Sequence, residues 1–255
     1  MNSVEVHYEL SGPSNAPVVV FAGSLGSSLR MWDPQSDALS GQFRVLRYDH
    51  RGHGESPSPE GPYAISELAG DVLSLLDRLG IDRVAFCGLS LGGMVGIWLG
   101  AHAPQRLTSL TLCCTSAHFD DPAPWLDRAA AVRAEGTASI AAGVVERWFT
   151  PDWAARHHDV VQRAAGMIYA TPDEGYASCA EAIADWDGRD LLGQIIVPTL
   201  VIAGAHDPAT PVAPHAETIV AGVPRARLEV LDAAHLATIE QARQASALIG
   251  EHAAS

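Results

Sequence analysis

The sequence predicts an α/β protein built on a mostly parallel, doubly wound sheet. Short apolar segments of strand length recur along the chain, and segments with helical periodicity separate them. Strands that are buried on both faces of a parallel sheet consist mainly of apolar residues, and most of these segments have that composition. The length of 255 residues suits one large α/β domain or one domain with an insertion.

Seven segments are predicted to be strands. Residues 4–10 alternate between apolar and polar side chains, as expected of a strand at the edge of the sheet. Residues 18–21 form a short continuous apolar run, and the remaining predicted strands are residues 43–48, 84–87, 107–114, 199–203 and 227–231.

Helices are predicted between and after these strands. Residues 66–79 repeat leucine and valine at helical spacing, with Ser66 as the expected N-cap and Gly80 as the end. Residues 92–102 are expected to form a helix that stops before a proline, because the residue preceding proline disfavours helical geometry. The chain from Leu236 onward is predicted to be the final helix.

One long segment interrupts the alternation of strands and helices. Residues 117–188 contain four of the six tryptophans, are helical in character and lack a strand-like apolar run. We therefore predict a helical cap over residues 117–188, inserted into a core domain formed by residues 1–116 and 189–255.

The charge balance excludes several classes of partner. The net charge of -14 repels phosphate backbones, so no nucleic-acid partner is expected. The sequence has no basic run that would suit a membrane surface and no apolar stretch of spanning length.

The N-terminal residues lack a basic region followed by an apolar run, so no signal peptide is expected. A cytoplasmic protein is predicted, and its oligomeric state is left open.

The four cysteines are expected to be buried, reduced thiols. None has CxxC spacing or a Cys/His pattern typical of zinc ligands. No metal and no other cofactor is therefore predicted.

A candidate nucleophile lies in the segment Gly88-Leu89-Ser90-Leu91-Gly92, which has the form G-x-S-x-G. The segment follows a predicted strand and precedes a predicted helix, which is the context of a nucleophile elbow. Glycines on either side relieve crowding at such a tight turn. Ser90 is predicted to be the nucleophile.

A serine hydroxyl needs a base, and the base needs an orienting acid, in the chain order Ser, Asp, His. Asp207 and His235 each follow a predicted strand and satisfy that order. Asp232 is the alternative acid, since it lies close to His235 in sequence. His206 adjoins Asp207 but precedes it, so its position does not fit the order.

Attack on an ester carbonyl also requires N–H donors for the developing oxyanion. The backbone N–H of Leu91, which follows the nucleophile, is the first predicted donor. The loop after the first buried strand should supply the second, and we favour the N–H of Leu25. His50 and His53, in the sequence DHRGHG, are expected to be polar turn residues that pack near the site and take no direct catalytic part.

Several motifs together resemble the α/β-hydrolase superfamily, and the finer features are similar to the 3-oxoadipate enol-lactonases. The segments that carry the resemblance are SLGSSLRMWDPQ, RVLRYDHRGHGESP, GPYAISELAGDVLSLLDRLGI, FCGLSLGGMVG, ERWFTPDW, EGYASCAEAI and GAHDPATP. The resemblance implies hydrolysis of a five-membered enol-lactone with an acetate arm, and it implies Ser90, Asp207 and His235 as the triad. Many relatives have His-Gly where this chain has Gly23-Ser24, which makes the second oxyanion donor less defined.

The implied substrate is an anionic small molecule, whereas the protein is strongly acidic. A buried carboxylate needs a partner, and arginine can bind both of its oxygens. The cap offers Arg128, Arg133, Arg147, Arg156 and Arg163, and no lysine. Arg133 is the preferred candidate, and the aromatic side chains of Trp125 and Trp148 are predicted to line the substrate site with it.

Two other functional classes fit the same residues. A cofactor-free perhydrolase or a general carboxylesterase uses the same triad. A ligand-binding receptor of this fold is the non-catalytic alternative. An intact triad argues against the receptor, because a binder does not need all three members.

Overall fold

The structure is a computed structural model that describes residues 3–255, and within them the strands form one seven-stranded sheet. The spatial order is β1-β3-β2-β4-β5-β6-β7, with β1 antiparallel to β3 and the other neighbours parallel. The strands are β1 (Tyr8–Ser11), β2 (Val18–Ala22), β3 (Arg44–Tyr48), β4 (Val84–Leu89), β5 (Leu107–Cys113), β6 (Thr199–Gly204) and β7 (Ala226–Leu231).

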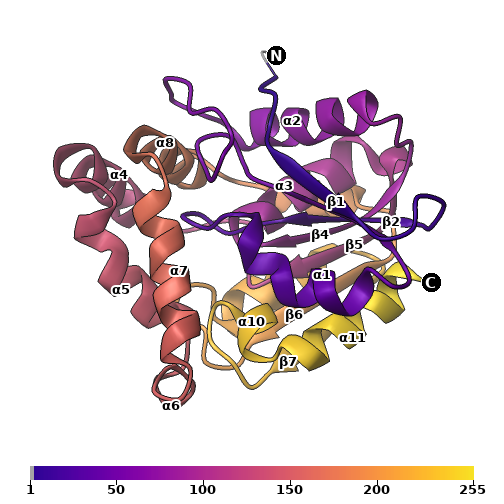
Figure 1. Cartoon of the computed structure of the whole chain (residues 1–255). Coiled ribbons are helices and arrows are strands. Elements are labelled where there is room, and N and C mark those ends of the chain that lie inside the picture. The colour runs from indigo at the N-terminus through magenta and orange to yellow at the C-terminus, as the bar shows by residue number, and fades with distance from the viewer. Residues whose placement is uncertain (1–2) are drawn as a thin grey trace.

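Helices cover both faces of this sheet. On one face α1 packs against α11, and on the other α2 packs against α3 (Figure 1). The core helices are α1 (Asp33–Leu39), α2 (Ile65–Arg78), α3 (Leu91–His102), α9 (Glu217–Gly222), α10 (Ala237–Glu240) and α11 (Ala242–Ala253). This arrangement confirms the predicted α/β class with a mostly parallel, doubly wound sheet.

Each of the seven predicted strand segments overlaps one strand of the sheet. The first one differs in extent, because β1 begins at Tyr8 and residues 4–7 form no strand. Its place at the edge of the sheet agrees with its alternating pattern. Residues 227–231 became β7 at the opposite edge of the sheet, and the other predicted segments became the inner strands, whose two faces helices bury.

Two details of the predicted helices were wrong. The second helix begins at Ile65 with Ala64 as N-cap, and the carboxylate of Glu67 accepts a hydrogen bond from the Ala64 N–H at 3.0 Å, so Ser66 is not the cap. The chain after Leu236 forms two helices, because Gln241 takes a non-helical conformation between them. The predicted end of α2 is confirmed, since Gly80 follows the helix with a φ of 64°.

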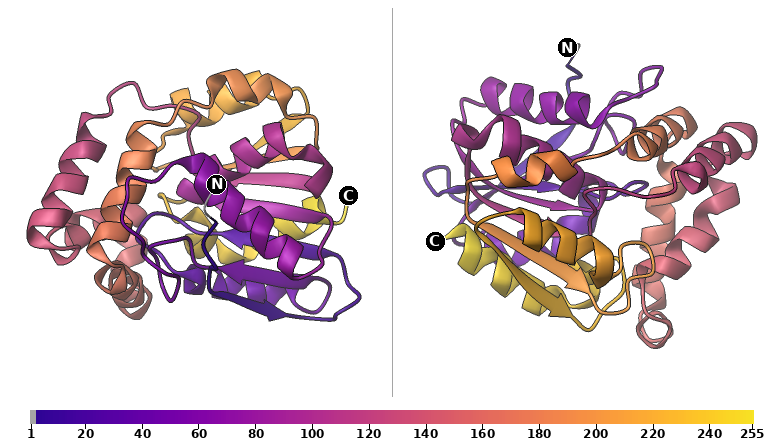
Figure 2. Two further views of the ribbon diagram at one scale, coloured as in Figure 1. Left: turned by 90° about the horizontal axis from the view of Figure 1, so that it is seen from above. Right: turned by 180° about the vertical axis from the view of Figure 1, so that it is seen from behind.

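Five further helices lie between β5 and β6 along the chain and gather at one end of the molecule (Figures 1 and 2). They are α4 (Ala123–Glu135), α5 (Ala138–Trp148), α6 (Pro151–Ala154), α7 (His158–Ala170) and α8 (Asp173–Ala184). We refer to them as the cap helices.

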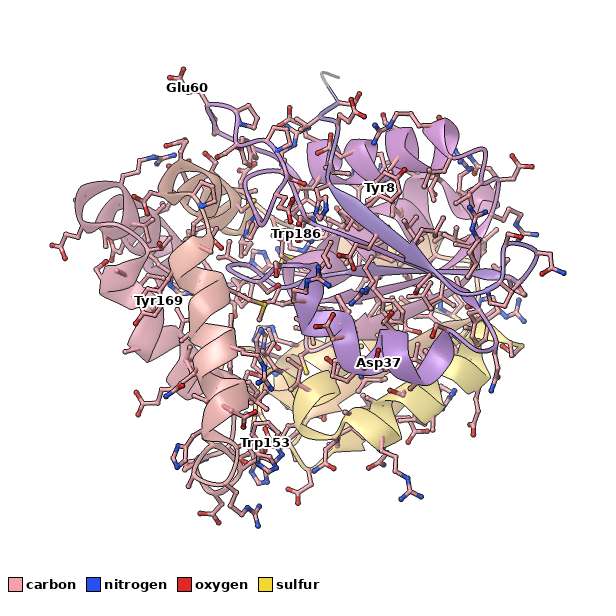
Figure 3. The ribbon with its side chains drawn as sticks, in the orientation of Figure 1. Tyr8, Asp37, Glu60, Trp153, Tyr169 and Trp186 are labelled. Carbon is pink, nitrogen blue, oxygen red and sulfur yellow. The ribbon has the colours of Figure 1, made fainter. Side chains whose placement is uncertain are left out.

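The chain enters and leaves the cap helices at neighbouring points. His118 and Asp187 form an isolated antiparallel bridge, and the Gly188 N–H donates to the Ala117 carbonyl at 2.7 Å. The indole N–H of Trp186, labelled in Figure 3, donates to the backbone carbonyl of Ser116 at 3.0 Å. These bonds fix both connections to the core.

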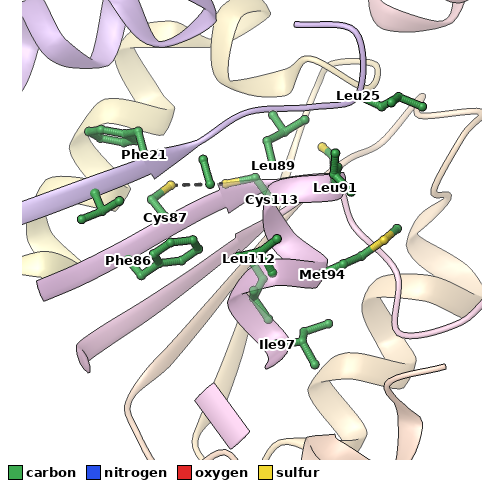
Figure 4. Close-up of a cluster of buried hydrophobic side chains, with 14 of the residues drawn as sticks. Phe21, Leu25, Phe86, Cys87, Leu89, Leu91, Met94, Ile97, Leu112 and Cys113 are labelled. Carbon is green, nitrogen blue, oxygen red and sulfur yellow. Dashed lines mark hydrogen bonds between the residues drawn. The ribbon is translucent and has the colours of Figure 1, made fainter. Parts of the chain in front are cut away.

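Apolar side chains fill the space around the inner strands (Figure 4). Leu89 and Leu91, on either side of Ser90, are fully buried in this cluster and anchor the turn between them. The Cys87 and Cys113 sulfurs lie 3.9 Å apart as free thiols. Cys114 and Cys179 are also free and buried, which confirms the prediction of buried, reduced cysteines.

Candidate active site

Ser90 occupies a strained turn between β4 and α3. Its φ of 56° and ψ of −113° lie in a region that residues with a side chain rarely adopt. A Cβ on Gly88 would lie 2.0 Å from the Gly92 carbonyl oxygen, and one on Gly92 would lie 2.3 Å from the Ala22 carbonyl oxygen. Both glycines of the G-x-S-x-G motif are therefore required by close backbone contacts.

Strand β5 and the residues after it hold the Ser90 backbone in this conformation. The Ser90 N–H donates to the Cys113 carbonyl at 2.9 Å, and the Thr115 hydroxyl donates to the Ser90 carbonyl at 2.7 Å. A Cβ on Gly93 would lie 2.5 Å from the Thr115 Cβ, so the third glycine permits this contact.

Asp207 and His235 form a buried pair at the ends of β6 and β7. The Asp207 Oδ2 lies 2.8 Å from the His235 Nδ1, and their side chains are 0% and 5% exposed. Because Nδ1 is bonded to Asp207, Nε2 is the ring nitrogen that can accept a proton from a nucleophile. The arrangement matches the orienting role of an acid in a Ser-His-Asp triad.

The Asp207 carboxylate is held by further donors. Its Oδ1 accepts from the N–H groups of Ala209 and Thr210 at 2.8 and 3.1 Å, and its Oδ2 accepts from the Thr210 hydroxyl at 2.6 Å. Burial alone raises the pKa of Asp207, but the charge and hydrogen bond of His235 and the bonds from Thr210 outweigh it and lower the pKa to about 2. Asp207 is therefore ionised at neutral pH.

Asp232, the alternative acid, pairs with a different histidine. The Asp232 carboxylate lies 2.8 Å from the Nε2 of His206, and both side chains are solvent-exposed. The structure thus pairs His235 with Asp207 and leaves Asp232 and His206 as a surface pair.

Ser90 and His235 line one cavity of about 320 Å³ between the sheet and the cap helices. No hydrogen bond joins the Ser90 hydroxyl to the imidazole within residues 3–255; such catalytic bonds commonly tighten only with substrate bound. The other residues that line the cavity are Ser24, Leu25, Phe119, Asp121, Pro124, Trp125, Arg128, Val144, Arg147, Trp148, Tyr176, Pro208 and Ala209.

The loop after β2 carries the Leu25 N–H, which has no acceptor in the described part of the chain. Its neighbours differ: the Ser24 N–H contacts the Met31 sulfur at 3.3 Å, and the Gly26 N–H donates to the His53 Nε2 at 2.9 Å. Within this loop the Leu25 N–H is therefore free for a substrate oxyanion.

The Leu91 N–H is the first of helix α3, so the helix provides no acceptor for it. Its position at a helix N-terminus also favours negative charge nearby. The side chains of Leu25 and Leu91 are buried in the apolar cluster of Figure 4, which fixes the backbone that carries both N–H groups.

His50 and His53 hold the loop after β2 in place through hydrogen bonds to its backbone. The His50 Nε2 donates to the Gly23 carbonyl at 3.1 Å, while His53 accepts from Gly26 and its Nδ1 donates to the Arg51 carbonyl at 3.2 Å. Burial lowers the pKa of His50 to about 3 and that of His53 to about 4, so both rings are neutral at pH 7. Sequence reasoning placed them near the site but did not identify this bracing of the loop.

The predicted cap residues divide into two groups. Trp125 and Trp148 line the cavity with Ser90. Arg133 does not, and this part of the prediction is corrected: its guanidinium binds the carboxylates of Glu174 and Glu181 on the exterior of the cap helices. Arg128 and Arg147 are the cap arginines that reach the cavity.

Glu240 is a residue that sequence reasoning missed. Its Oε2 accepts from the Ala234 N–H at 3.0 Å and from the Thr150 N–H at 3.2 Å, and its Oε1 accepts from the Thr150 hydroxyl. Glu240 thereby links the loop of His235 to the cap helices. No sequence motif marks it, since the contact joins segments 90 positions apart.

Within residues 3–255, no group of three or more His, Cys, Asp or Glu side chains has the arrangement of a metal site. The helices of this same part of the chain include none that is long and apolar enough to cross a membrane.

Comparison with known proteins agrees with this architecture. The family described as "alpha/beta hydrolase fold" matches residues 17–242. The 3-oxoadipate enol-lactonase 2 of Acinetobacter baylyi is 40% identical over 93% of this chain and 89% of its own length.

Two solved structures are also similar. The enol-lactonase from Burkholderia xenovorans is 42% identical and superposes with a TM-score of 0.97, covering 100% of this chain and 98% of that one. A thermophilic esterase from Thermogutta terrifontis, with malate bound, is 30% identical with a TM-score of 0.92, covering 97% of this chain and 92% of that one. The chain therefore belongs to the α/β-hydrolase fold family, as a relative of the 3-oxoadipate enol-lactonases.

Proposed function

We propose that this protein is a serine hydrolase that opens the lactone ring of 3-oxoadipate enol-lactone to give 3-oxoadipate. The observation that carries the proposal is the buried Asp207–His235 pair, which lines one cavity with the strained Ser90. Identity of 40% to a 3-oxoadipate enol-lactonase over most of both chains supports the choice of substrate.

In the first half of the reaction Ser90 attacks the lactone carbonyl. His235 takes the serine proton through Nε2, and Asp207 holds the imidazole in the tautomer that makes this transfer possible. Negative charge develops on the carbonyl oxygen, where the N–H groups of Leu25 and Leu91 stabilise it.

Collapse of the tetrahedral intermediate breaks the ring C–O bond. The leaving oxygen is an enolate that takes the proton from His235 and stays tethered to the acyl group, because both belonged to one ring. The enol then converts to the ketone. Water, activated by His235, attacks the acyl-enzyme and releases 3-oxoadipate and free Ser90.

The proposed reactants are small molecules, and no nucleic-acid or membrane partner is part of the proposal. We place the protein in the cytoplasm. The four free, buried cysteines support this, because reduced thiols suit a reducing compartment.

The direct test is a turnover assay with freshly generated 3-oxoadipate enol-lactone beside a neutral aryl ester such as 4-methylphenyl acetate. We expect kcat/KM to be much larger for the lactone. A preference for the neutral ester would favour the alternative, a general carboxylesterase or perhydrolase. Binding of the lactone without turnover would support a receptor and contradict the proposal.

A further inference from the structure

Two arginines of the cap helices line the cavity of Ser90 without a carboxylate partner. Arg128 lies on α4 and Arg147 on α5, and neither forms an ion pair within residues 3–255. Other cap arginines are paired: Arg133 with Glu174 and Glu181, and Arg163 with Asp159. Among the cap arginines without an ion pair in residues 3–255, Arg156 is exposed and lies outside this cavity, so Arg128 and Arg147 are the unpaired cations at the cavity.

The two guanidinium groups also lie close enough to repel one another. Burial lowers the pKa of Arg147, and the positive charge of Arg128 lowers it further. Asp121 is a third charged residue at the cavity, and one of its carboxylate oxygens accepts from the Ala123 N–H at 3.0 Å. Like charges brought together in a half-buried site are unfavourable unless an anion binds between them.

The Tyr176 hydroxyl is a third hydrogen-bond donor at this cavity. The Tyr176 side chain is fully buried and lines the cavity, yet its hydroxyl makes no hydrogen bond of normal geometry in the described chain. Burial raises the pKa of Tyr176, while the charges of Arg128 and Arg147 and the approach of the Arg128 guanidinium to the hydroxyl oxygen oppose that rise, so the hydroxyl lies beside both cations. A buried, unpaired hydroxyl costs free energy that a bound acceptor would recover.

Aromatic side chains shape the surroundings of these donors. The Arg128 guanidinium lies 4.6 Å from the centre of the Trp125 ring, which restricts its position from one side. Phe119 contacts Trp125 with ring centres 5.2 Å apart, and Trp148 provides a further apolar wall. The cavity therefore combines a cationic patch with walls suited to a flat, partly apolar ring.

We propose that Arg128, Arg147 and Tyr176 form a subsite for the carboxylate of the substrate. The inference rests on the proposed function and narrows it: the enzyme selects lactones and esters that carry a carboxylate arm. The arm binds this subsite while the reacting carbonyl lies at Ser90. The local cations offset the repulsion that a protein of net charge -14 exerts on an anion.

Direct binding tests the subsite independently of turnover. Adipate, a dicarboxylate, is titrated calorimetrically into the wild type, Arg128→Met, Arg147→Met and the double variant. A hydrogen bond to a charged group is worth roughly 1.5–3 kcal/mol, so each single variant should weaken Kd by about ten- to a hundredfold. Tyr176→Phe should weaken it by only about two- to tenfold, because a neutral donor contributes less. Arg163→Met, which removes an equal charge from the exterior, is the control and should bind adipate as the wild type does.

Kinetics then assigns the subsite to the carboxylate arm. The enol-lactone and the methyl ester of its acetate arm differ only in that charge. In Arg147→Met the kcat/KM for the free acid should fall by about ten- to a hundredfold, with the methyl ester nearly unaffected. Melting temperatures should be unchanged or raised, because the variants remove an unpaired charge.

Any of three results would overturn the subsite. They are no adipate binding by the wild type, unchanged adipate binding by the double variant, and equal losses of kcat/KM on the free acid and its methyl ester. A wild type that binds adipate through these residues but does not turn over the lactone would contradict the proposed function alone.

Discussion

The Oδ2 atom of Asp207 lies 2.8 Å from the Nδ1 atom of His235, and both side chains are buried beneath the cavity. Asp207→Asn should lower kcat by roughly 10⁴-fold, because the amide favours the wrong imidazole tautomer. Steady-state turnover of the lactone measures the loss. Asp232→Asn is the matched control, since it removes a carboxylate from the surface pair with His206 and should leave kcat unchanged. A severe loss in Asp232→Asn with near-normal Asp207→Asn would show that the acid is misassigned.

The neutral histidines beneath the oxyanion loop should make the fold sensitive to acid. An unfolded histidine binds its proton near pH 6.5, whereas folded His53 and His50 do so near pH 4 and 3. Between these values the unfolded chain binds more protons, so the stability contribution is complete above pH 6.5 and is lost as the pH falls toward 3. For His53 alone the difference corresponds to roughly 3 kcal/mol.

Urea denaturation at pH 7, 5.5 and 4.5 measures this effect. The free energy of unfolding should decline over the series, and His53→Gln should flatten the decline while lowering stability at pH 7. Asp207 adds a further loss below pH 3.8, because its folded pKa is about 2. An equally steep decline in His53→Gln would rule out the neutral ring as the source.

Glu240 should matter for stability and for the placement of His235. Glu240→Gln removes the negative charge that the N–H groups of Ala234 and Thr150 donate to, and it replaces the oxygen that accepts from the Thr150 hydroxyl with an amide group that cannot accept. We expect about 1–3 kcal/mol of lost stability together with a lower kcat. The pH dependence of kcat should keep its shape, because Glu240 does not touch the reacting atoms. Unaltered stability in Glu240→Gln would mean that this link contributes nothing.

Catalysis should not depend on a metal. Ser90, His235, Asp207 and two backbone N–H groups provide every step of acyl transfer, so activity should survive exhaustive chelation. Activity that disappears with a chelator and returns with zinc would contradict this expectation.

The sequence was informative where chemistry or burial constrains residue type. Inner strands such as β4 and β6 are buried along their whole length and are almost entirely apolar, because helices cover both faces of the sheet. The elbow glycines are required by backbone contacts as close as 2.0 Å. Asp207 and His235 follow strands of one parallel sheet, whose ends meet at one edge. Each of these signals is local, or depends only on chain order.

The remaining features depend on how the cap helices dock, which no local pattern records. Arg128 and Arg133 are five residues apart on α4, so they point in directions separated by roughly 140° around the helix. The two arginines are equivalent in the sequence. The docking of α4 against α8 is what directs Arg128 to the cavity and Arg133 to Glu174. The short helix α1 was likewise not predicted, because its segment DPQSDAL has little apolar periodicity.

The most direct test of the central claim is the turnover of 3-oxoadipate enol-lactone by the wild type and by Ser90→Ala. Both proteins are purified in parallel, and matching melting curves confirm that the variant is folded. We predict rapid hydrolysis by the wild type and a decrease in kcat of about a million-fold in Ser90→Ala, as for the loss of a triad serine. Near-normal hydrolysis by the folded Ser90→Ala protein would contradict the account.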